Sequence, residues 1–151
     1  MFDSGIRLLS PVVMGQRLPG PDPAELAQYS ALLIGVGAIG EAERWIETID
    51  GALEPNKYLF GAFAQISRWN YSAAVSPLEK YIGHPKPKPY DKLVARTNLI
   101  HALVSAKEYQ TAKPEIESML RLTEEQEHWL LLGNVLESAV VRSTELVEWN
   151  E

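Results

Sequence analysis

The chain has 151 residues, of which 46% are apolar and 23% are charged, and it carries a net charge of −6 and no cysteine. This length fits one domain, and the apolar content excludes wholesale disorder. The lack of cysteine excludes disulfides, thiolate metal sites and thiol nucleophiles, and the acidic balance argues against a nucleic-acid partner.

Neither a membrane span nor a secretory signal is expected. The longest apolar run, residues 31–40, is far shorter than the ~20 residues that a membrane span needs. The first residues, MFDSGIRLL, place no basic cluster ahead of an apolar block. We therefore expect a cytoplasmic protein.

Proline and glycine divide the chain at residues 16–23, 51–57 and 83–90, where a helix cannot continue. Between these breaks, apolar residues recur three and four positions apart, which is the helical period. No segment of comparable length alternates as a strand does. The pattern predicts an all-α protein.

One template occurs three times along the chain. It consists of a large residue, an alanine three positions later, and apolar residues four and seven positions after the alanine. The alanines, 32 and 38 residues apart, are Ala42, Ala74 and Ala112.

A second apolar stripe precedes each of these alanines. Its middle, twelve residues earlier, is Ser30, Ala62 or Ile100. The repeating unit is therefore two antiparallel helices, and the small residues let their backbones approach closely. One such hairpin cannot bury its apolar face alone, so stacked neighbours must complete the core.

The repeats resemble the tetratricopeptide repeat, whose pattern is Trp-x2-Leu-Gly-x2-Tyr followed by a helix with Ala-x3-Phe and a later proline. Residues 24–137 carry the resemblance, although Ile100 is bulky where the family prefers glycine. The resemblance implies a right-handed α–α superhelix (solenoid) of antiparallel helical hairpins. The matching residues are Trp129, Leu132, Gly133 and Leu136, the pairs Ala42/Ile46, Ala74/Leu78 and Ala112/Ile116, and Pro55.

We predict a single domain over residues 1–151 that consists of full and partial repeats. The first segment reads as the second helix of a partial repeat, and the last segment reads as another partial repeat. We infer that the chain belongs to a longer array or forms a homo-oligomer. The units are 2–15, 24–55, 56–83, 90–122 and 124–151.

The resemblance also implies a function. In tetratricopeptide proteins the first helices line a concave groove that holds a peptide or a partner helix, so we expect a non-catalytic adaptor or scaffold for proteins. The residues that project onto this groove are Phe63, Ile66, Thr97, Asn98, His101, Leu130, Asn134 and Glu137.

Two alternatives remain. Gly35–Gly40 matches G-x-G-x-x-G, the loop of a small dinucleotide-binding enzyme, which requires residues 31–34 to form a strand. In the repeat interpretation the same glycines form a turn between two helices. The second alternative is a helical repeat that serves only self-assembly.

No pattern indicates catalysis, a metal or a cofactor, so we predict none of them. The three histidines lack ligand spacing, and no G-x-S-x-G motif occurs. Trp45, Trp69 and Trp129 fall on apolar stripes and are expected in the core. Pro77 and Pro114 predict a kink or a late helix start.

Overall fold

The computed structural model describes residues 2–15 and 20–148. Eight helices are the only regular elements in these ranges, which confirms the all-α prediction. Residues 16–19 of the expected break and residues 149–151 of the expected segment 124–151 lie outside the described part of the chain.

The chain divides into two compact units, Met1–Trp69 and Asn70–Glu151, which we call unit 1 and unit 2. The division falls inside the predicted repeat 56–83. The two helices of that repeat therefore belong to different units.

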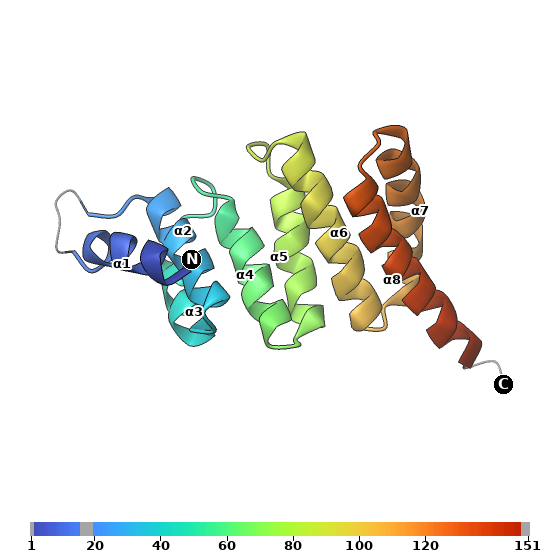
Figure 1. Ribbon diagram of the computed structural model, residues 1–151, viewed down its shortest axis with the longest axis horizontal. Coiled ribbons are helices and arrows are strands. Elements are labelled where there is room, and N and C mark those ends of the chain that lie inside the picture. Colours follow the sequence, from blue (N-terminus) through green and yellow to red (C-terminus); the bar gives the residue numbers. More distant parts are fainter. Residues whose placement is uncertain (1, 16–19, 149–151) are drawn as a thin grey trace. The chain divides into compact units, whose positions relative to one another are not determined.

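Unit 1 contains four helices, and three of them pack around the second (Figure 1). The second helix contacts the other three, and the third also packs on the fourth. An Asp22–Glu25 capping box begins the central helix, because each side chain accepts a hydrogen bond from the other residue's backbone N–H. The helices are α1 (Phe2–Val13), α2 (Pro23–Gly35), α3 (Ile39–Thr48) and α4 (Asn56–Ser67).

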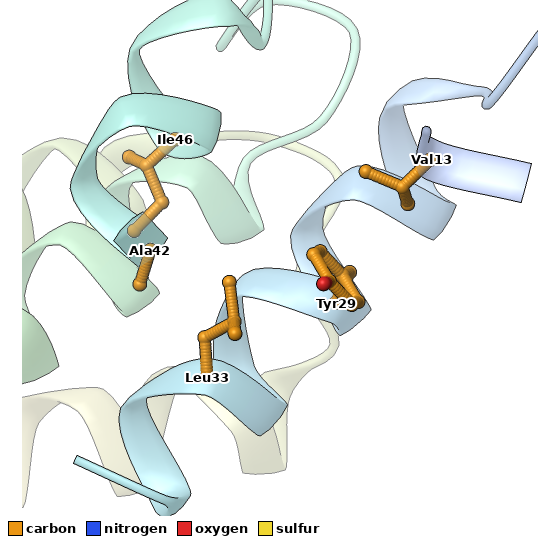
Figure 2. Close-up of a cluster of buried hydrophobic side chains, with 5 residues drawn as sticks. All are labelled: Val13, Tyr29, Leu33, Ala42 and Ile46. Atoms are coloured by element: carbon orange, nitrogen blue, oxygen red, sulfur yellow. The ribbon is translucent and has the colours of Figure 1, made fainter. Parts of the chain in front are cut away.

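The core of unit 1 joins the end of α1 to α2 and α3. Figure 2 shows its buried side chains, and Trp45 packs against them with its ring 6.4 Å from that of Tyr29 in a T-shaped contact. Isolated helices of this length are marginal in water, so we expect the packing of the three helices to stabilise each of them. The buried members are Val13, Tyr29, Leu33, Ala42 and Ile46.

Unit 2 repeats this order of contacts. Its second helix contacts the other three, and its third packs on its fourth (Figure 1). The helices are α5 (Tyr71–Gly83), α6 (Pro89–Ser105), α7 (Tyr109–Glu125) and α8 (Trp129–Glu148).

The positions at the centre of the predicted repeats are all fully buried, as the pattern requires. Ser30 is the one hydroxyl among them, and its Oγ donates to the backbone oxygen of Leu26 at 2.8 Å. Five of them are small, as close approach of neighbouring helices requires, and the sixth is the bulky Ile100. The six positions are Ser30, Ala42, Ala62, Ala74, Ile100 and Ala112.

A left-handed residue ends the first helix of each predicted pair. Gly37, Trp69 and Lys107 all have positive φ, and they are spaced 32 and 38 residues apart, as the alanines are. Around Gly37, the N–H of Ala38 donates to Leu33 O at 2.9 Å and the N–H of Gly37 to Ile34 O at 3.0 Å. These two bonds form a Schellman motif, which stops the helix and reverses the chain.

The Gly35–Gly40 loop is such a turn. Residues 31–34 belong to helix α2, and α3 begins at Ile39. The strand that a dinucleotide-binding loop requires is therefore replaced by a helix.

Two of the three tryptophans expected in the core are exposed. Trp69 is 80% exposed because it is a left-handed turn residue. Trp129 is 62% exposed because α8 turns Leu131 and Val135 inward, and a position two residues before Leu131 lies on the opposite side of the helix. The core prediction was wrong for both residues, whereas Trp45 packs against the core as expected.

The prolines do not delay their helices. Pro77 and Pro114 lie inside α5 and α7, which begin at Tyr71 and Tyr109. A late helix start is therefore wrong at both positions. Each proline lacks the N–H that would close one backbone hydrogen bond, and the helix continues on both sides of it.

Candidate binding site

A cavity of about 220 Å³ lies between α6 and α8 in unit 2. Five of its six lining residues belong to the predicted groove. Side chains that lie 33 or more positions apart in the sequence are thus brought together from two helices. The lining residues are Thr97, Asn98, His101, Asn134, Glu137 and Ser138.

Helical spacing explains how each helix contributes. Thr97 and His101 are four positions apart on α6, and Asn134 and Ser138 are four positions apart on α8, so each pair lies on one helix face. Because α6 packs on α8, the two faces meet. The packed side of this boundary contains Thr97 and Ser138, which are buried, and its open side contains His101 and Glu137, which are exposed.

Backbone carbonyls of the same helices hold three of these side chains. Thr97 Oγ1 donates to Leu93 O at 3.0 Å, and Asn98 Nδ2 donates to Val94 O at 2.9 Å. Ser138 Oγ donates to Asn134 O at 3.2 Å. These bonds fix the positions of the polar groups in the cavity before any ligand arrives.

The polar groups at the open side of the cavity are less fully engaged. The His101 ring makes a T-shaped contact with Tyr71 of α5, with ring centroids 5.6 Å apart. Among the residues that the structure describes, Glu137 has no ion-pair partner, and the Asn134 side chain has no hydrogen-bond partner. The site therefore offers an amide and a carboxylate for new contacts.

Three residues of the predicted groove lie elsewhere. Leu130 is on α8 but is 75% exposed and does not line this cavity. Phe63 and Ile66 are half-buried on α4 in unit 1, where the Phe63 ring contacts that of Phe60 at 6.2 Å. The groove as one continuous surface stays a prediction.

Sequence reasoning missed two residues at the site. Ser138 lines the cavity, and its signal was its position four residues after Asn134, on the same helix face. Tyr71 was recognised only as part of the repeat template. No spacing rule connects Tyr71 to His101, because their contact depends on how α5 packs on α6.

Two larger cavities lie in unit 1. One, of about 400 Å³ between α1 and α2, is mainly apolar, and its acids Asp22 and Glu25 are engaged in capping α2. The other, of about 370 Å³, lies beside α3 and is lined by residues that include Arg44 and Trp45. Neither contains a residue of the predicted groove, so the α6–α8 cavity is the better candidate.

Metal-binding clusters and membrane-spanning helices are both absent from the described ranges. Residues 2–15 and 20–148 contain no group of three or more His, Asp or Glu side chains that could hold a metal ion. In the same part of the chain, none of the helices combines the length and apolar character needed to cross a membrane.

Comparisons of the chain with known protein families, with curated proteins and with solved structures gave no match. The all-α architecture and the helices packed in adjacent pairs are compatible with a helical repeat.

Proposed function

We propose that this protein is a tetratricopeptide-like repeat, a right-handed solenoid of helical hairpins, that acts as a non-catalytic adaptor in the cytoplasm. It binds an extended peptide or a partner helix. The observation that carries the proposal is the polar cavity between α6 and α8, because it contains five residues that the repeat pattern assigns to a groove.

The chemistry of the cavity supports peptide recognition. Asn98 and Asn134 present amides, which can both donate to and accept from a peptide backbone. The Asn98 side chain is held by Val94 O, so it meets the peptide in a fixed orientation and loses little entropy on binding.

A selection experiment tests this function. Random peptides displayed on phage are selected on the immobilised full chain, and their affinities are measured for the wild type and for the Asn98→Ala/Asn134→Ala variant. We expect the double variant to lose about tenfold or more in affinity, which corresponds to ~1.4 kcal/mol. The matched control is Gln110→Ala/Gln126→Ala, which removes two exposed amides outside the cavity.

The proposal fails if the selected peptides bind the double variant as tightly as the wild type. Unchanged circular dichroism and melting temperature in both variants ensure that lost affinity is not lost folding. Alanine favours a helix more than asparagine does, so neither substitution should weaken α6 or α8.

Self-assembly is a second candidate function, and one side of α8 favours it. Leu136 and Val140 follow Trp129 by seven and eleven positions, so the three residues share one helix face. Each is about half exposed or more. If a second copy covers this stripe, light scattering will show a dimer that Val140→Glu dissociates. A monomer at all concentrations contradicts this candidate.

A further inference from the structure

We propose that the α6–α8 cavity binds the guanidinium group of an arginine side chain in the partner peptide. This inference rests on the proposed function and names the residue that the site selects. It follows from which hydrogen-bonding groups the cavity leaves open, from its charge and from its size.

The two hydroxyl groups of the cavity can act only as acceptors. A hydroxyl has one hydrogen, and Thr97 Oγ1 donates it to Leu93 O while Ser138 Oγ donates it to Asn134 O. A ligand that meets either oxygen must therefore bring a donor.

The amides and the carboxylate add further acceptors. Asn98 uses its Nδ2 on Val94 O, which leaves its Oδ1 open. Glu137 contributes two oxygens that only accept when the carboxylate is ionised. The open acceptors thus outnumber the donors, which come from the amides and from one nitrogen of His101.

The only formal charge fixed in the cavity is negative. No lysine or arginine lines it, and the two arginines of its helices are engaged with α7. Arg96 donates to Glu115 and Ser118, and Arg142 donates to the backbone oxygen of Tyr109. Among the described residues, Glu137 has no cationic partner, so its carboxylate is open to a cation of a ligand.

The size of the cavity restricts the ligand to one side chain. Its volume of about 220 Å³ is below the ~300–1,000 Å³ of sites for drug-sized molecules. A guanidinium presents five N–H donors in a plane, whereas an ammonium presents three on a point charge. Guanidinium thus matches a cavity with several separated acceptors better.

The test uses four capped peptides, acetyl-Gly-Ala-Xaa-Ala-Gly-amide, in which Xaa is arginine, citrulline, lysine or glutamate. Citrulline has nearly the shape of arginine but no charge. Each peptide is titrated into the ¹⁵N-labelled full chain, and the shifts of Asn98, His101 and Asn134 are followed. We expect the arginine peptide to bind about fivefold tighter than the citrulline peptide, the scale of a charge-assisted contact at a partly exposed site.

Matched charge variants assign this preference to one carboxylate. In Glu137→Gln the preference for arginine over citrulline should fall below about twofold. In Glu125→Gln, which removes an equal charge from an exposed position on α7, the fivefold preference should remain. Glu137 is exposed, so Glu137→Gln should melt at the wild-type temperature.

The outcomes separate this inference from the proposed function. Equal binding of arginine and citrulline peptides, tighter binding of the lysine peptide, or an arginine preference that survives Glu137→Gln overturns the guanidinium assignment alone. If no peptide shifts the cavity resonances and the phage selection also yields nothing, both proposals are overturned.

Discussion

Unit 1 and unit 2 have the same order of helix contacts, yet their central helices carry different side chains. The turn residues Gly37 and Lys107 and the buried alanines Ala42 and Ala112 are both 70 positions apart. This offset aligns α2 with α6. It sets Ala31 of unit 1 against His101 of unit 2, and it sets Ala27 and Gln28 against Thr97 and Asn98.

The fourth helix of each unit shows the same difference, with apolar side chains at the core of unit 1 and polar side chains at the cavity of unit 2. In unit 1, α4 packs Phe60 against the core and places Phe63 in ring contact with it. In unit 2, α8 presents Asn134 and Glu137 to the cavity. The contrast teaches that the two units share buried positions in their packing, while the neighbouring positions are free either to join the core or to line a polar cavity.

The largest expected effect tests whether each unit depends on its own core. Leu33→Ala in unit 1 and Leu78→Ala in unit 2 remove buried side chains, and each should destabilise by about 2–5 kcal/mol. Hydrogen exchange should rise chiefly in residues 23–67 for Leu33→Ala and in residues 71–125 for Leu78→Ala.

The control for these variants is Leu8→Ala, which truncates a side chain that is 74% exposed and should cost less than about 0.5 kcal/mol. An equal rise of exchange in both units after either core substitution would contradict the comparison, because it would make the two cores one cooperative element.

The sequence predicted the helices and the repeat spacing well because these depend on local pattern. Periodicity and breaking residues located the helices, and Ala42, Ala74 and Ala112 marked interior positions that are fully buried. The exposure of Trp69 was missed because glycine is the usual left-handed turn residue, and nothing in the local sequence marks a tryptophan for that role.

The cavity was predictable only in part. The repeat register placed Asn98, His101 and Asn134 on groove-facing sides, but it could not reveal which residues meet. The cavity depends on how far α8 slides along α6, and the contact of Tyr71 with His101 depends on α5. Such distances arise from packing between helices and leave no periodic trace.

Substitutions in the aligned turns should change the free energy of unfolding by smaller amounts and in opposite directions in the two units. Gly37→Ala should destabilise by ~1 kcal/mol because φ at this position is +84°, and Lys107→Gly should stabilise by ~1 kcal/mol because it relieves a φ of +63°. Urea denaturation measures both. Lys107→Gly also removes an exposed ion pair, in which Lys107 Nζ lies 3.9 Å from Glu145. Its loss should reduce the gain in stability only slightly.

A third turn checks whether positive φ lowers stability without the loss of a lysine. Glu127 has a φ of +56° in the α7–α8 turn, so Glu127→Gly should also stabilise the chain. If Glu127→Gly and Lys107→Gly both lower the midpoint, the positive φ does not strain these two turns of unit 2.

The smallest expected effect compares one ion pair in each unit. Arg96 pairs with Glu115 at 2.5 Å, and both are more buried than Arg68, which pairs with Glu43 at 2.8 Å. Arg96→Leu should cost about 1 kcal/mol and Arg68→Leu about 0.5 kcal/mol or less, because water screens the more exposed pair. Double-mutant cycles with Glu115→Gln and Glu43→Gln, repeated in 1 M NaCl, isolate each coupling.

The coupling of Arg96 with Glu115 should survive salt better than that of Arg68 with Glu43. The reverse order would mean that the Arg96–Glu115 pair of unit 2 is more open to water than the Arg68–Glu43 pair of unit 1.

The most direct measurement is a crystal structure of the full chain with a phage-selected peptide. We predict that the peptide lies between α6 and α8, with polar contacts to Asn98 and Asn134. A peptide seated only on the apolar cavities of unit 1, with the α6–α8 cavity empty, would contradict the view that the polar central helix of unit 2 makes it the binding unit.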